Sequence, residues 1–391
     1  MASKQSSREM MSSEPATGSS SGSGRCPAAI IAEDRLSSLP DKLLHNIMSF
    51  LPAWQAVQTC LLSPRWRNLW RSMPCLDIDQ REFDAAASRA RGDRAAWECV
   101  RFVEFVDKLL TLRGGRSSLD TFRCHITHRY EVKVVEGWVR HGIECNPAVM
   151  EISWPSHAMF FPWLPHSGPT PCRLTRLKRL HLAGVALDAG FAQKLRSGGC
   201  PVLEDLQIER CFLDSPEITC HTLKSLVVIG CGSYFDSVLT ITAPALASFR
   251  LAMATTGFNW RGIVVNEMPS LVKASVCSSH VASCKLLCSL VNVQMLELSG
   301  SKTLSMFGME SDAFPTFHNL RTLLLDGCNL NDDFKTLECF LNNAPSLEKL
   351  TLHYCQASRT FREKEKNGTS NGDTGATSGQ SNFPVYKIEV D

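Results

Sequence analysis

Cysteine and histidine are the residues of this chain whose spacing could hold a metal ion. Cys277, His280, Cys284 and Cys288 lie close together. Zinc sites usually combine two tight pairs of the Cys-x-x-Cys type, whereas these three cysteines are seven and four positions apart. Buried thiols that act as small apolar side chains account for them better. The sequence therefore predicts neither a metal site nor a cofactor.

We find no recognised catalytic motif in the sequence. The glycine pairs at 22, 24 and at 114, 115 lack the strand-loop-helix context of a phosphate-binding loop. No Gly-x-Ser-x-Gly or His-Glu-x-x-His motif occurs. His128, His157 and His353 have no acid and nucleophile at recognisable positions. We therefore expect a binding protein and not an enzyme.

Composition narrows the class of partner and the compartment. Apolar residues form 44% of the 391 residues, and the formal net charge is +2, so no basic field favours nucleic acid or acidic lipid. The apolar run at 28–32 is too short for a signal peptide or a membrane span. Seventeen cysteines, an odd number, suggest reduced thiols. We expect a cytoplasmic or nuclear protein.

Two kinds of element position the remaining candidate residues, and the first is a compact helical unit at 34–78. Apolar residues at 43, 44, 47, 50 and 51 share one helical face, with Pro40 suited to the first helical position. A second helix is predicted after Pro52, and Ser63-Pro64 opens a third. About forty residues cannot bury both apolar stripes well, which suggests a partner; a plain three-helix core remains the alternative.

The second kind of element is a repeat from residue 119 to 356, in which apolar residues recur as Leu-x-x-Leu-x-Leu. Each copy predicts one strand and one return segment. The copies begin at residues 177, 203, 223, 246, 271, 293, 320 and 347, with two degenerate copies at 119 and 149. Cys211, Cys231, Cys328 and Cys355 each follow the first apolar residue by eight positions, where a small polar side chain can bond the turn. A proline before several copies is expected to end a return helix.

Side chains between the repeated leucines must face away from the core, because neighbours on a strand point to opposite sides. They predict a mixed-charge concave face of a parallel sheet, with an apolar spot near Val227. We expect this face to bind a protein, although a merely solvated sheet is the alternative. The candidate target-binding residues are Arg179, His181, Asp205, Gln207, Val227, Ile229, Arg250, Lys273, Glu297, Leu324 and Lys349.

The segment from Leu39-Pro40 to Ser63-Pro64-Arg65-Trp66-Arg67-Asn68-Leu69-Trp70 resembles an F-box. The resemblance implies that this unit binds a Skp-type adaptor and, through it, a cullin. Pro64 replaces the basic residue that is more usual there. The contact residues that the resemblance carries over are Leu39, Pro40, Leu43, Leu44, Ile47, Val57, Leu61, Trp66 and Leu69.

The segments that follow are similar to plant F-box/leucine-rich-repeat proteins, through Phe105 to Leu110, Leu119 to Arg123 and Trp138-Val139. The resemblance implies an α/β protein: a small all-α F-box of three helices, then a curved leucine-rich-repeat solenoid. The FBD-type region that often closes these proteins is expected to be reduced or absent. The expected layout is a disordered segment 1–33, the F-box 34–78, a helical linker 79–118, the solenoid 119–356 and a disordered tail 357–391, with one edge strand possible near the end.

Together these features predict a substrate receptor of a Skp–cullin–F-box ubiquitin ligase, whose repeats hold an unknown target protein. The chain itself would do no bond chemistry. The alternative is a repeat protein that serves as an interaction scaffold and joins no ligase. Neither nucleic acid nor membrane is an expected partner.

Overall fold

The computed structural model describes residues 36–88, 95–114, 118–128, 130–155, 174–233, 237–253, 260–266, 268–277, 284–300, 314–355 and 387–390. The chain divides into two compact units, 1–39 and 40–391, and the second holds the described helices and strands. The predicted disordered segment 1–33 lies outside these residues, as does most of the tail. None of the described helices is both long and apolar enough to cross a membrane.

The second unit begins with the predicted helical region. Helices α1 (Asp41–Met48) and α2 (Ala53–Gln58) each follow a proline, and two 3₁₀ helices continue, η1 (Thr59–Leu61) and η2 (Pro64–Ser72). Pro40 precedes the first helical residue instead of occupying it. The third predicted helix is thus a 3₁₀ helix, in which side chains three apart stack on one side. Trp66 and Leu69 have this spacing, and both are buried.

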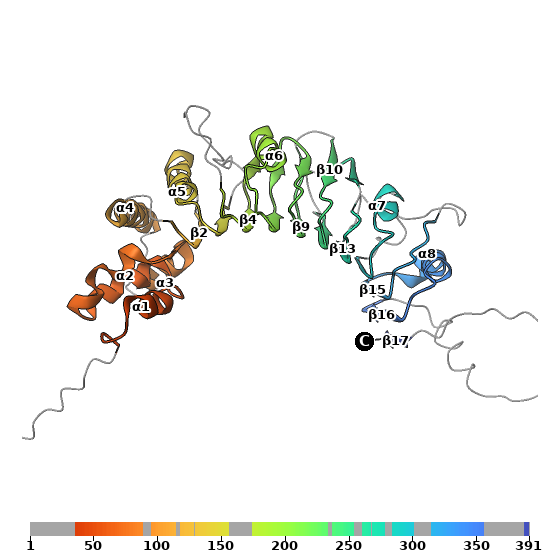
Figure 1. Cartoon of the computed structure of the whole chain (residues 1–391), viewed down its shortest axis with the longest axis horizontal. Coiled ribbons are helices and arrows are strands. Elements are labelled where there is room, and N and C mark those ends of the chain that lie inside the picture. Colours follow the sequence, from red (N-terminus) through yellow and green to blue (C-terminus); the bar gives the residue numbers. More distant parts are fainter. Residues whose placement is uncertain are drawn as a thin grey trace, which may run out of the picture. The chain divides into compact units, whose positions relative to one another are not determined.

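A parallel sheet of twelve strands starts immediately after these helices and follows the sequence order (Figure 1). The ten repeat copies form ten of its strands, and the prediction of a leucine-rich-repeat solenoid is confirmed. The strands are β1 (Cys75–Asp79), β2 (Thr121–His125), β3 (Val149–Ser153), β4 (Arg179–Ala183), β6 (Asp205–Glu209), β9 (Ser225–Ile229), β11 (Ser248–Ala252), β13 (Lys273–Cys277), β14 (Met295–Ser299), β15 (Thr322–Asp326), β16 (Lys349–His353) and β17 (Lys387–Val390).

Strand β1 was not expected, because no repeat copy precedes residue 119. It lies within the segment predicted as the F-box and pairs with β2 in parallel, Cys75 against Thr121. Helices α3 (Gln80–Ser88) and α4 (Ala95–Arg113) form the return between these two strands. The sheet therefore reaches back to the end of the helical region, and the helical linker is a return segment of the solenoid.

Helices were expected in the return segments, and only some of the returns contain them. Helices α5 (Val132–Glu144), α6 (Ala189–Arg196), α7 (Cys284–Ser289) and α8 (Leu330–Asn342) fill four returns. A short pair of strands, β5 (Ala186–Leu187) and β7 (Phe212–Leu213), accompanies α6. Before β9, β11 and β13 the return is a strand instead: β8 (Glu217–Thr219), β10 (Val238–Thr242) and β12 (Gly262–Asn266) form a second parallel sheet. Their β-branched residues favour the extended form.

The turn after each strand reuses one backbone conformation. Seven positions beyond the first apolar residue of six copies, the residue has a positive φ: Gly184, Arg210, Gly230, Gly300, Gly327 and Tyr354. At Gly184 a side chain is impossible without movement, because a Cβ atom would meet the Trp154 carbonyl oxygen at 1.9 Å. The next residue is a predicted cysteine in four copies. The thiol of Cys231, for example, donates to the Ile208 carbonyl of the preceding repeat at 3.4 Å, so the predicted role of these cysteines is confirmed.

Buried contacts join the helical region to the solenoid. Arg113, at the end of α4, is 8% exposed and donates to the carbonyl oxygens of Trp70 and Met73. Burial lowers the pKa of its guanidinium. A series of aromatic contacts also links these elements: Phe83 contacts Trp54 and Phe102, and Phe102 contacts Trp138. The first helices and the first strands therefore share one core.

The last strand, β17, lies in the segment that was expected to be a disordered tail with one possible edge strand. It pairs with β16 in parallel, Lys387 against Lys349. The intervening residues 356–386 lie outside the described part of the chain. An edge strand beside the final repeat covers backbone groups that would otherwise be open to another chain.

Candidate functional site

The first candidate surface lies on α1, on its C-terminal turn and on the residues around η1. Leu43 is 49% exposed, Ile47 43% and Leu61 84%. Pro40 is also exposed, whereas Val57 and, in the preceding unit, Leu39 are half-buried. Burial of an apolar side chain is favourable, so a group of large apolar side chains left in water is typical of a protein-binding site.

Three of the predicted adaptor contacts belong to the core beneath this surface. Leu44 is 0% exposed, Trp66 4% and Leu69 7%. Helical spacing identified the residues of the stripe but did not separate those that face inward from those that face outward. These three side chains support the surface by packing under it.

Two further apolar side chains of the helical region are exposed and were not among the predicted contacts. Phe50 is 83% exposed and Leu62 65%. We name the set Leu43, Ile47, Phe50, Leu61 and Leu62 the helical apolar face. Leu62 also lines a hollow of about 560 Å³, with Trp54 of α2 and Ala85 of α3. The signal for Phe50 was present in the sequence, since it follows Ile47 by three positions on the apolar stripe.

The second candidate surface is the side of the twelve-stranded sheet that the sequence predicts as the concave one. Strand pairing keeps a constant register, so that first, third and fifth positions of neighbouring strands lie side by side. Most of these positions are half-buried or exposed, with Ala183, Ser275 and Thr351 as buried exceptions, while the second and fourth positions are buried. We call them the exposed sheet face.

All predicted target-binding residues lie on the exposed sheet face. Arg179, Asp205, Lys273 and Lys349 occupy first positions. Ile229 occupies a fifth position. The third positions hold His181, Gln207, Val227, Arg250, Glu297 and Leu324.

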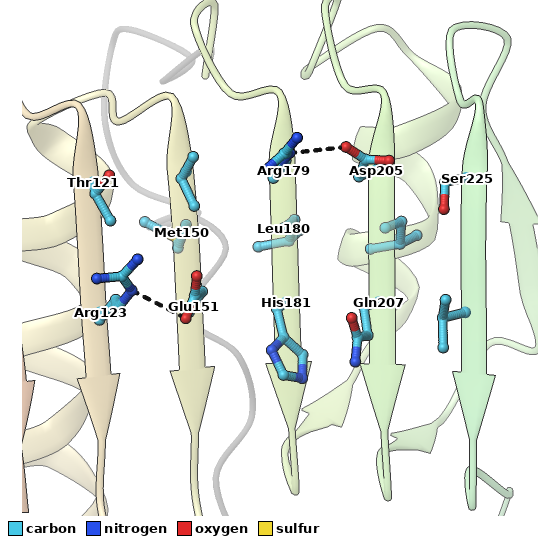
Figure 2. Close-up of a pocket in the computed structure, with 13 residues that line it drawn as sticks. Thr121, Arg123, Met150, Glu151, Arg179, Leu180, His181, Asp205, Gln207 and Ser225 are labelled. Atoms are coloured by element: carbon cyan, nitrogen blue, oxygen red, sulfur yellow. Dashed lines mark hydrogen bonds and ion pairs between the residues drawn. The ribbon is translucent and has the colours of Figure 1, made fainter.

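A hollow of about 480 Å³ opens on this face across β2, β3, β4, β6 and β9 (Figure 2). Two ion pairs between neighbouring strands form part of its floor. The Arg123 Nε lies 3.2 Å from Glu151 Oε2, and the Arg179 Nε lies 3.0 Å from Asp205 Oδ2. The imidazole of His181 lies on the same strand as Arg179 and next to Glu151 in Figure 2. Val227 of β9 also lines the hollow.

Charged side chains on β1 to β6 are matched to partners on neighbouring strands. Asp77 lies 3.8 Å from Arg123, and His181 lies 3.6 Å from Glu209. The match is incomplete at Asp77. Burial raises the pKa of its carboxyl to about 6 despite the opposing effect of Arg123, and its Oδ1 is buried without a hydrogen bond.

Asp77, Arg123 and Glu151 were not among the predicted target-binding residues. Asp77 lies on the unexpected strand β1, and the other two lie on β2 and β3. The copies that form β2 and β3 were recognised as degenerate, and their intervening side chains could have been placed on the face by the same alternation.

The exposed sheet face changes character from β9 onward. Val227 and Ile229 on β9 and Met295 on β14 bring apolar side chains to it. Arg250 on β11 and Lys273 on β13 are exposed. Neither of these cations forms an ion pair with a carboxylate of the described residues, in contrast to Arg123 and Arg179.

Comparison with known proteins identifies two domains in the chain. Residues 36–77 match the F-box domain, and residues 165–371 match the leucine-rich-repeat domain described as At1g61320/AtMIF1, LRR domain. The chain is 33% identical over 361 residues to the MEIOTIC F-BOX protein MOF of Oryza sativa subsp. japonica, which covers 85% of this chain and 74% of that protein.

Two Arabidopsis thaliana proteins are also similar along most of the chain. The F-box/FBD/LRR-repeat protein At1g78750 is 24% identical over 377 residues, covering 85% of this chain and 79% of that protein. The F-box/LRR-repeat protein At4g14096 is 26% identical over 354 residues, covering 81% and 72%. The order of the two matched domains is the order seen in the structure, and the chain belongs to the family of plant F-box proteins with leucine-rich repeats.

Proposed function

We propose that this chain is the substrate-recognition subunit of a Skp–cullin–F-box ubiquitin ligase. The helical apolar face docks a Skp-type adaptor, and the adaptor connects the chain to a cullin. The exposed sheet face holds a target protein. The observation that carries the proposal is the exposure of Leu43, Ile47, Phe50, Leu61 and Leu62 within the segment that matches the F-box domain.

The mechanism is one of placement, and the chain contributes no catalytic group. Holding a target beside the ubiquitin-carrying enzyme raises its effective concentration there, which lowers the entropic cost of the transfer. The buried contacts of Arg113 and the aromatic contacts favour this role, because they tie the helical region to the first strands. We place the complex in the cytoplasm or the nucleus.

Retention of a Skp-type adaptor by the purified chain tests the proposal. We expect Leu43→Asp and Ile47→Asp to abolish retention, because each puts a carboxylate into an interface that must exclude water. The matched control is Asn46→Asp, which adds the same charge at an exposed position of α1. Trp66→Ala is a poor test, since Trp66 is buried and its loss would disturb the fold.

The outcome also separates the ligase from the scaffold alternative. A wild-type chain that retains no adaptor, or a Leu43→Asp variant that retains it as well as the wild type, would contradict the proposal. Either result would leave a repeat protein that binds partners without assembling a ligase. Circular dichroism of each variant establishes that the helices are intact.

A further inference from the structure

We propose that the exposed sheet face from β9 to β14 recognises an extended acidic segment of the target, in which an apolar side chain precedes two carboxylates at alternate positions. The inference rests on the proposed role of this face in target binding. Its basis is the difference between two parts of the face, one whose charges are matched internally and one whose cations are not.

On β1 to β6 the arginine side chains of the exposed sheet face are paired with carboxylates of neighbouring strands. Arg123 has carboxylates on both neighbouring strands, at 3.8 Å (Asp77) and 3.2 Å (Glu151), and Arg179 has Asp205 at 3.0 Å. A ligand that used these groups would first have to displace a partner on the chain. Little net electrostatic gain is therefore available there.

On β11 and β13 the two cations remain available. Arg250 and Lys273 are exposed, and no ion pair joins them to a described carboxylate. The strand register also gives each cation an apolar neighbour. Arg250 lies opposite Val227 on β9, and Lys273 lies opposite Met295 on β14, which is 39% exposed. The two cations thus lie on adjacent strands, flanked by the apolar side chains of Val227 on β9 and Met295 on β14.

The geometry sets the spacing of the groups that would be recognised. Adjacent strands are about 4.8 Å apart, and alternate side chains of an extended segment are about 6.6 Å apart on one face. Val227 also lines the hollow that Figure 2 shows, so an apolar side chain can enter there. Carboxylates two and four residues later then come within reach of the long side chains of Arg250 and Lys273.

The far limit of this acidic recognition is set by β14. Glu297 lies at the third position, in register with Ser275 of β13, which in turn lies opposite Arg250. A carboxylate placed there would be repelled by Glu297. The face therefore selects acidic groups over β11 and β13 and disfavours them beyond.

Binding of labelled peptides to the full chain, followed by fluorescence anisotropy, tests the proposal. The probe has the order Leu-Ser-Glu-Ser-Glu between Gly-Ser flanks, and three matched peptides carry Gln, Lys or phosphoserine in place of each Glu. We expect the Glu peptide to bind about tenfold more tightly than the Gln peptide, a difference of about 1.4 kcal/mol. We expect that preference to shrink at high salt.

Charge reversal gives the decisive comparison. An Arg250→Glu, Lys273→Glu double variant should prefer the Lys peptide, a gain that misfolding cannot produce. The matched control, Arg101→Glu with Lys133→Glu, makes the same change of net charge on α4 and α5, where both residues are exposed. It should keep the preference for the Glu peptide. A neutral variant, Arg250→Gln with Lys273→Gln, should discriminate little between the peptides.

The proposal is overturned if the Glu peptide shows no binding, if the Gln peptide binds equally well, or if the reversed variant still prefers Glu. Binding of the phosphoserine peptide alone would also overturn it, because the recognised group would then be a phosphate. Adaptor retention is measured on the same variants and should be unchanged. A failure of the proposed ligase role would thus appear in adaptor retention and not in peptide binding.

Discussion

The helical apolar face and the floor of β1 to β6 are both proposed to face a partner, but they differ in the contacts that the chain already makes there. On the helices, Phe50 and Leu61 are more than 80% exposed, at 83% and 84%. On the strands, Arg123 and Arg179 already have carboxylates at 3.2 Å and 3.0 Å. The first surface gains free energy from any cover that excludes water. The second gains only from a ligand that improves on contacts that exist. Tight constitutive docking therefore suits the helices, and selective binding suits the sheet.

The largest loss of stability is expected at a residue that was predicted to lie on the helical surface but is buried beneath it. Trp66→Ala should lower the free energy of unfolding by about 3–5 kcal/mol, because a large buried ring leaves a cavity. Leu43→Ala, at a side chain that is 49% exposed, should cost less than about 1 kcal/mol. Urea unfolding followed by circular dichroism measures both. Equal losses would mean that the distinction between core and surface is wrong.

The connection between the two surfaces can be broken at Arg113. Arg113→Met should cost about 3 kcal/mol, because the Trp70 and Met73 carbonyl oxygens would lose a buried donor. The control is Arg101→Met on the same helix, where the side chain is exposed and little change is expected. Urea unfolding of the two variants makes the comparison. If Arg113→Met is as stable as Arg101→Met, the buried guanidinium does not hold the helices to the solenoid.

Asp77 sharpens the comparison, since it is the point where the matching of charges on the sheet is incomplete. Its pKa is raised to about 6 by burial, against an ordinary value of 3.8. Between these values the folded chain holds more protons than the unfolded one, so this group lowers stability as pH rises through that window. Its destabilising effect is complete above pH of about 6 and absent below about 4.

Asp77→Asn removes this effect. The variant should be more stable than the wild type by about 2 kcal/mol at neutral pH, and the gain should disappear toward the acid end of the window. Urea unfolding at a series of pH values measures it, with Asp120→Asn as an exposed control whose side chain is 60% accessible. A gain that did not depend on pH would show that the burial of the charge is not its cause.

The smallest effect on stability is expected at an ion pair whose two charges are matched and whose side chains are exposed to solvent. In the Arg179–Asp205 pair the side chains are 70% and 41% exposed, so Arg179→Gln should change stability by less than about 0.5 kcal/mol. A double-mutant cycle with Asp205→Asn isolates the pair. A coupling energy above about 1 kcal/mol would contradict this expectation and show that the ion pair contributes substantially to the stability of the fold.

The sequence predicted most of the solenoid because its information is local. Every Leu-x-x-Leu-x-Leu copy became a strand, and alternation alone placed residues such as His181 and Arg250 on the correct face. What it missed depends on contacts between distant residues. The bond from Arg113 to Trp70 spans 43 positions. Likewise, helical spacing groups Leu43 with Leu44, and only the packing of η2 against α1 shows which is covered.

The constant register of the strands has a consequence for how such a protein can diverge. From residue 177 on, successive copies are separated by 20 to 27 residues, yet the strands remain aligned position by position. Insertions and deletions can be accommodated in the return segments without moving the side chains of the exposed sheet face. A single codon change at an odd strand position then edits one point of the recognition surface without disturbing its neighbours, so new targets can be acquired by point mutation on an unaltered frame.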